Sequence, residues 1–122
     1  FIGDTALGEL VPSGGITSKR PQWAIMPADW AARIGVREPD LCILPIGEYL
    51  YRANHISPEE AWSIFEAVSG RRLMAIHWRT FILSPRDQQP IFAPMERLRS
   101  AAGARAGSIV CTEPGETYRL PP

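Results

Sequence analysis

Three side chains in this sequence stand where they could support metal binding or acid–base chemistry. They are the acid Asp4 and the two histidines of the chain, His55 and His77. Asp4 follows a short apolar run that stops at Gly3, and His77 follows the apolar run 72–76, so both come where a strand is expected to end. Taken singly, such a histidine is more often a structural hydrogen bonder, and such an aspartate is more often a turn former.

The elements around the two histidines form a strand, loop, helix, strand unit. The apolar run 41–44 predicts a buried strand, and the loop that leaves it carries His55. A helix beginning at Ser57 follows, and the run 72–76 predicts a second strand. A right-handed crossover makes these strands parallel and brings their exit loops to one edge of the sheet. We therefore expect the His55 loop to lie beside His77.

A capping box predicts the start of the helix. Ser57 is the expected N-cap, Pro58 occupies the first helical position, and Glu60 the third. Gly70 is the expected stop. The helix should bury four apolar residues at spacing i, i+3, i+4, i+7: Ala61, Ile64, Phe65 and Val68.

The rest of the chain predicts shorter elements. Residues 10–21 are rich in Pro, Gly and Ser and predict an exposed loop, and residues 28–34 predict a short helix closed by a glycine. A second long helix is expected over 94–102. Two short strands are expected over 108–111 and 117–120, on either side of a Pro-Gly turn.

Composition limits the class of protein. The 122 residues are 45% hydrophobic and balance 13 basic against 13 acidic side chains, so we expect one soluble domain with no nucleic-acid partner and no membrane span. Cys42 and Cys111 are expected to be free buried thiols in a reducing, cytoplasmic location. Phe1 reads as part of a strand already in progress, and we expect the chain to be a fragment.

Four motifs in order resemble the second half of metallo-β-lactamase-superfamily hydrolases. Within that family the chain is similar to the branch that contains N-acyl phosphatidylethanolamine-hydrolysing phospholipase D and the ascorbate-phosphate lactonases. The motifs are G-D-T at 3–5, D-L-C-I-L-P-I-G at 40–47, H-I-S-P-E-E-A at 55–61, and A-I-H-W with T-F within 75–81.

The resemblance implies an α/β fold in which residues 1–122 form the C-terminal half of an αββα sandwich, with a mixed sheet and helices on one face. It also implies roles for three residues. Asp4 corresponds to the carboxylate that bridges two metal ions, and His77 to the last imidazole ligand of the second metal. His55 corresponds to a catalytic histidine that binds no metal and contacts the scissile phosphate or the leaving group.

The family pattern also requires a His-x-His-x-Asp-His motif and one further histidine before G-D-T, and these are absent here. The resemblance therefore implies a metal-dependent hydrolase of phosphodiester or lactone-type substrates that is active only with its N-terminal half. We expect two divalent ions in that complete enzyme, with Zn²⁺ favoured and Mn²⁺ or Fe²⁺ left open, and weak binding or none in this chain alone.

The expected partners follow from the missing N-terminal half of the fold. The N-terminal half of the fold or another covering chain should pack on the exposed apolar face, and a homo-oligomer is left open. The alternative is a non-catalytic half-domain that acts as an interaction or assembly piece. In that case Asp4 and His77 serve only as hydrogen bonders at strand ends.

The chain departs from the family pattern in three places. Arg79 stands where the family usually has a glycine, and this would put a long cation beside the metal site. Residues 48–52 follow the usual pattern only in part. Residues 6–30 are longer than the family leads us to expect, and they could form a lid or a partner surface.

Overall fold

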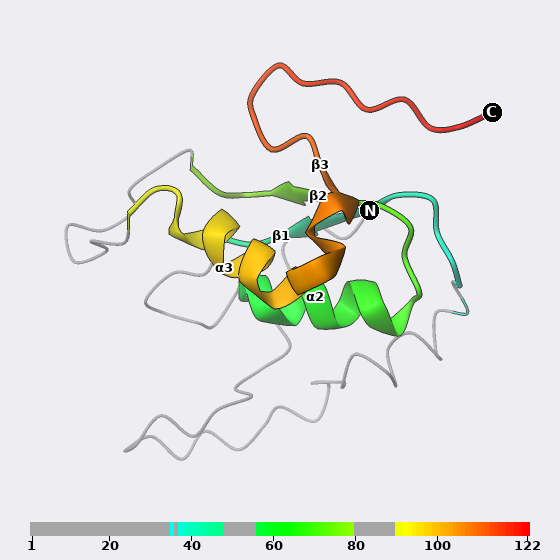
Figure 1. Cartoon of the computed structure of the whole chain (residues 1–122), viewed down its shortest axis with the longest axis horizontal. Helices are drawn as coiled ribbons and strands as arrows, with labels where there is room; N and C mark the ends of the chain where they lie inside the picture. Colours follow the sequence, from blue (N-terminus) through cyan, green and yellow to red (C-terminus); the bar gives the residue numbers. More distant parts are fainter. Residues whose placement is uncertain (1–34, 36, 48–55, 80–89) are drawn as a thin grey trace, which may run out of the picture.

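A computed structural model describes residues 35, 37–47, 56–79 and 90–122 of the chain. The expectations for Phe1, for the loop over 10–21 and for the helix over 28–34 lie outside these residues. In the described part the elements follow one another in this order (Figure 1): β1 (Cys42–Pro45), α2 (Pro58–Ala67), β2 (Leu73–Ile76), α3 (Ala93–Ala102), the 3₁₀-helix η1 (Gly103–Ser108) and β3 (Ile109–Val110).

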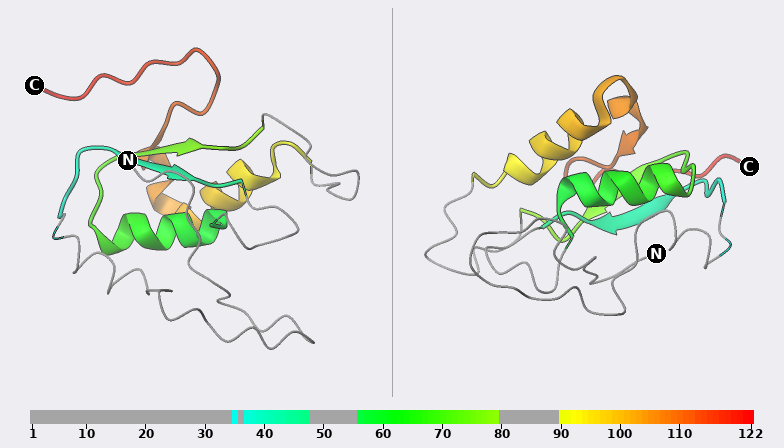
Figure 2. Two further views of the ribbon diagram at one scale, coloured as in Figure 1. Left: turned by 180° about the vertical axis from the view of Figure 1, so that it is seen from behind. Right: turned by 90° about the horizontal axis from the view of Figure 1, so that it is seen from below.

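The three described strands form a parallel sheet in the order β1-β2-β3. Cys42 pairs with Leu73, and Leu73 pairs in turn with Ile109. Both crossovers step across the sheet in the same direction, so right-handed connections place both helices on the same face. Figures 1 and 2 show α2 and α3 together on that face. The predicted α/β class, with helices on one face, is confirmed, although the mixed sheet is not seen among the described strands.

One face of this sheet forms the hydrophobic core with the helices. Alternate residues along each strand point toward α2 and α3, and these are buried: Leu44, Leu73, Ala75 and Ile109. The helices contribute Phe65 and Leu98, both fully buried. Neither helix in the described part has the length and apolar character that crossing a bilayer requires.

The other face of the sheet is also apolar. It carries the intervening residues of the register, which are Ile43, Pro45, Met74, Ile76 and Val110. Pro45 is fully buried, and the other four are half-buried. Residues paired across parallel strands lie on the same face, so these four side chains form one continuous surface.

Helix α2 begins as predicted. The Glu60 amide donates to the Ser57 hydroxyl at 3.1 Å, and the Glu60 carboxylate accepts from the Ser57 amide at 2.7 Å. These two bonds complete the capping box. The four predicted apolar positions, from Ala61 to Val68, are all buried.

The predicted role of Gly70 at the end of α2 was wrong. The left-handed residue is Ser69, with φ of 55°, and its amide donates to the Glu66 carbonyl, while the Gly70 amide donates to the Phe65 carbonyl. Gly70 is required for packing instead. A Cβ there would lie 2.5 Å from the Phe65 ring.

The predicted elements after residue 90 are confirmed in part. The helix over 94–102 corresponds to α3, and the strand over 108–111 is shortened to β3. The predicted strand over 117–120 was wrong, because these residues belong to no strand in the structure. Cys42 and Cys111 are free, as predicted, but they are half-buried rather than buried.

An ion pair joins the two helices. Arg97 of α3 donates to both carboxylate oxygens of Glu59 in the first turn of α2, from Nε at 2.8 Å and from Nη2 at 2.6 Å. Partial burial alone would raise the pKa of Glu59. Bonds and charge from Arg97 and a bond from Ser57 outweigh this and hold the pKa of Glu59 below its usual value.

We expect Ser57→Ala to lower the free energy of unfolding by about 0.5–2 kcal/mol, because it removes the acceptor that satisfies the Glu60 amide. Ser63→Ala, in the same helix, should change it by less than about 0.5 kcal/mol, because Ser63 is exposed. Urea unfolding of both variants measures the difference. Equal effects would mean that the cap does not stabilise the helix.

We expect the Glu59–Arg97 pair to contribute roughly 0.2–1 kcal/mol, since the Glu59 side chain is about half exposed. Because the folded pKa of Glu59 is lowered, this contribution is complete above the unfolded pKa and is lost as the pH falls through the folded pKa. Urea midpoints of wild type and Glu59→Gln should therefore differ near neutral pH and converge in acid. Glu96→Gln, in the first turn of α3, is the matched control. A difference that persists unchanged in acid would contradict the assignment.

Candidate functional site

His77 is the predicted site residue that lies within the described part of the chain. It comes directly after β2, and it is exposed. Its backbone has φ of 55°, the left-handed region that histidine enters more readily than most residues. The imidazole therefore stands at the carboxyl edge of a parallel sheet, where α/β proteins bind ligands.

The segment after β1 reaches the same edge and contacts the backbone of His77. The Ile46 amide donates to the Ile76 carbonyl at 3.0 Å, which extends the pairing of the strands. A Cβ on Gly47 would overlap the carbonyl oxygen of His77, so only glycine allows this approach. Ile46 and Gly47 thus lie beside the backbone after β2, whereas the predicted neighbour, the His55 loop over 48–55, lies outside the described residues. His55 itself and Asp4 lie outside the described residues.

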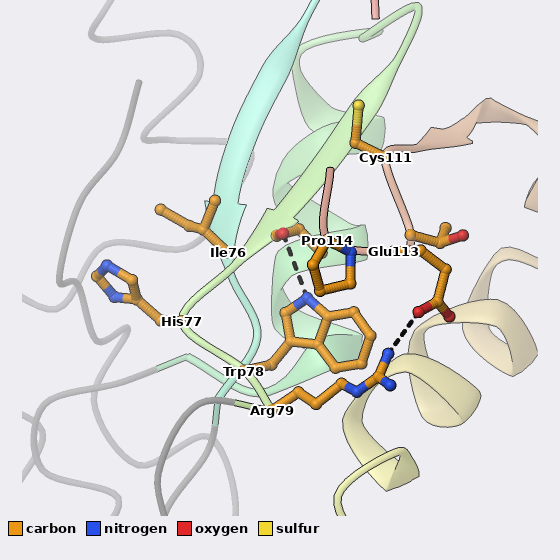
Figure 3. A pocket seen from close by; sticks show the side chains of 9 residues that line it. Ile76, His77, Trp78, Arg79, Cys111, Glu113 and Pro114 are labelled. Atoms are coloured by element: carbon orange, nitrogen blue, oxygen red, sulfur yellow. Dashed lines mark hydrogen bonds and ion pairs between the residues drawn. The ribbon is translucent and has the colours of Figure 1, made fainter. Parts of the chain in front are cut away.

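A hollow of about 360 Å³ opens between the segments that follow β2 and β3. Figure 3 shows Trp78 and Arg79 on one side of it and Glu113 and Pro114 on the other. The Trp78 indole donates to the carbonyl of Ala75 at 3.3 Å. The site therefore has an aromatic wall and a charged rim.

Arg79 connects three separate segments at this rim. Its Nη1 donates to the Glu113 carboxylate at 2.6 Å, and its guanidinium lies 4.4 Å from the centre of the Phe92 ring. Glu113 follows β3, while Phe92 precedes α3. The two contacts fix the position of the cation.

The His77 ring and the Arg79 guanidinium point to opposite sides of the segment after β2 (Figure 3). The predicted metal site also includes Asp4, which lies outside the described residues, so the placement of the Arg79 cation beside that site stays a prediction. The left-handed backbone at both residues, with φ of 55° and 61°, accompanies this divergence. Two separate surfaces meet at this segment, one at the His77 ring and one at the hollow.

The described residues do not by themselves fit a two-metal centre. Within residues 37–47, 56–79 and 90–122 there is no group of three or more His, Cys, Asp or Glu side chains that could hold an ion. A catalytic zinc ion takes about three protein ligands. Of the two predicted ligands, His77 is at a suitable edge and Asp4 lies outside the described residues.

Sequence reasoning missed Glu113 and Trp78 as members of a site. Trp78 was noted only as part of the motif A-I-H-W, and Glu113 stands in a loop with no motif of its own. The pairing of Arg79 with Glu113 spans 34 positions of the chain. Patterns of neighbouring residues do not predict a contact between positions so far apart in the sequence.

Comparison with known proteins relates the chain to a hydrolase. No family model matches it. A stretch of 83 residues is 31% identical to the mitochondrial N-acyl-phosphatidylethanolamine-hydrolyzing phospholipase D of Saccharomyces cerevisiae, a metallo-β-lactamase superfamily member. The match covers 63% of this chain and 17% of the yeast protein. The chain is therefore a distant, partial homologue of that enzyme, and the predicted resemblance is confirmed.

We expect Gly47→Ala to separate the segments after β1 and β2, because the added methyl group would occupy the position of the His77 carbonyl oxygen. Overpacking of this kind costs about 1–3 kcal/mol. Gly107→Ala is the control, since a Cβ there meets nothing within 4 Å. Urea midpoints and the NMR shifts of His77 measure the two effects. An unchanged midpoint and unchanged His77 shifts in Gly47→Ala would contradict the close approach.

Proposed function

We propose that this chain is the C-terminal part of a metal-dependent hydrolase with the metallo-β-lactamase fold. Its substrates are phosphodiesters or lactone-type esters, and its activity requires the N-terminal half of the fold. The observation that carries the proposal is the partial homology to a phospholipase D of that superfamily. The chain spans only 17% of that relative, so most of such an enzyme must come from other sequence.

The position of His77 supports the proposal. Its imidazole is exposed at the carboxyl edge of β2, and β2 is the central strand of the described sheet. A side chain directly after a rigid central strand is held more firmly than one on a long loop, which suits a metal ligand. Neutral imidazole is also the commonest protein ligand of transition metals.

The apolar second face of the sheet supports the need for another half. The face carries the half-buried Ile43, Met74, Ile76 and Val110 beside the buried Pro45. In a sandwich, such a face packs on the inner face of a second sheet about 10 Å away. The N-terminal half of the fold would supply that sheet and complete an αββα arrangement.

The ligand count leads to the same requirement. We assign Asp4 as the bridging carboxylate and His77 as a terminal ligand, and the remaining ligands would come from the N-terminal half. Zn²⁺ suits this set of imidazole and carboxylate donors, and Mn²⁺ and Fe²⁺ accept it too. His55 is assigned a role in contact with substrate, without a bond to metal. An imidazole suits proton transfer to a leaving group.

The test uses the complete protein that contains both halves. We expect His77→Ala and Asp4→Ala each to lower the bound metal and to reduce hydrolysis of bis(p-nitrophenyl) phosphate by at least about a hundredfold. His55→Ala should reduce turnover while the metal content stays at the wild-type level. Elemental analysis and a chromogenic rate assay measure the two quantities on the same samples.

The two histidine variants serve as controls for one another, because each removes one imidazole from the proposed site. Equal metal content in His77→Ala and wild type would remove His77 from the site. A complete protein with neither bound metal nor hydrolysis would favour the alternative, a non-catalytic half-domain that acts as an assembly piece.

A further inference from the structure

The hollow between the segments after β2 and β3 lies where α/β proteins bind small molecules. Both strands are parallel and adjacent, so the hollow stands beyond their carboxyl ends. Its volume of about 360 Å³ falls within the range of small-molecule sites. Three of its lining residues, His77, Arg79 and Cys111, have a left-handed backbone. Such strain in residues other than glycine is concentrated at binding sites.

Arg79 is held in place before any ligand arrives. Glu113 accepts from Nη1, and the Phe92 ring lies under the guanidinium. A guanidinium carries five N–H donors, and among the described residues no acceptor contacts the edge formed by Nε and Nη2. That edge has the fork geometry that binds a carboxylate or a phosphate through two parallel bonds.

Trp78 gives the hollow an apolar wall. The half-buried ring is oriented by the bond from its Nε1 to the carbonyl of Ala75. Ile76 and Pro114 also line the hollow. These groups would take the apolar or aromatic body of a ligand whose anionic group contacts Arg79.

We propose that this hollow binds a small molecule that joins a phosphate or carboxylate to an aromatic or apolar body. Arg79 binds the anionic group, and Trp78 packs against the body. Glu113 neutralises part of the charge of Arg79, so binding is weaker than at an unpaired arginine. Glu113 thus sets the affinity while holding the cation in position.

This site goes beyond the proposed hydrolase and does not depend on it. The His77 ring points away from the hollow (Figure 3), so a ligand at Arg79 and Trp78 is separated from any metal at the imidazole. Binding should therefore occur in the absence of metal ions. It should also survive replacement of His77 by alanine.

The experiment titrates the intact chain with phenyl phosphate in the presence of EDTA and follows backbone amide shifts by NMR. We expect saturable shifts at Ala75, Trp78 and Thr112, and tighter binding than for inorganic phosphate or benzyl alcohol. Inorganic phosphate keeps only the anionic group of the ligand, and benzyl alcohol keeps only the aromatic body. Benzoate, titrated in the same way, distinguishes a carboxylate ligand from a phosphate ligand by its relative affinity.

Variants assign the contacts. Arg79→Gln should weaken phenyl phosphate binding by about tenfold or more, because a charge-assisted bidentate contact is lost. Glu113→Gln should strengthen it severalfold. Arg72 lies at the opposite end of β2, so Arg72→Gln is the matched control. This variant should bind phenyl phosphate with the affinity of wild type. Arg79→Lys keeps the charge and removes the fork, so it should lose most of the affinity even if Arg79→Gln fails to fold.

Three results would overturn the proposal. The first is equal affinity in wild type and a folded Arg79 variant. The second is a set of shifts that centres away from Trp78 and Thr112. The third is binding that appears only with added Zn²⁺ and disappears in His77→Ala, because the ligand would then belong to the metal site. The affinities of the Arg79 variants and the location of the shifted amides test this site even if the complete protein shows no hydrolase activity.

Discussion

Burial of α2 against the sheet, centred on Phe65, is the interaction on which the rest of the described structure depends. Phe65 is fully buried, lies 4.9 Å from the Trp62 ring centre, and packs so closely on Gly70 that no side chain fits there. This contact holds the return of the chain from α2 into β2. The parallel pairing of β1 with β2 follows, and with it the close approach of Gly47 to the backbone of His77.

The segment after β2 divides the chemistry of this edge into two surfaces. A left-handed backbone at His77 and Arg79 sends their side chains to opposite sides. Arg79 is also held by Glu113, which follows β3, and by Phe92, which precedes α3, so segments distant in sequence stabilise its direction. An imidazole site and an anion site can therefore lie within three residues of one another without sharing a ligand.

The incomplete ligand set and the apolar second face have one physical explanation in the hydrolase proposal. The sheet buries one face against helices and leaves Ile43, Met74, Ile76 and Val110 half-buried on the other, so these side chains keep part of their contact with water. A second sheet would remove that contact and bring further ligands to the same edge. Homology to 17% of a larger hydrolase agrees with this arrangement.

The local elements were determined by sequence alone: the capping box at Ser57 and the apolar runs 41–44 and 72–76 predicted α2, β1 and β2, because short-range hydrogen bonds and side-chain periodicity decide such elements. Order along the chain also predicted that His77 stands at a sheet edge. Tertiary structure alone decided the direction of Arg79 and its pairing with Glu113. These outcomes depend on contacts between distant segments, and residue order does not encode them locally.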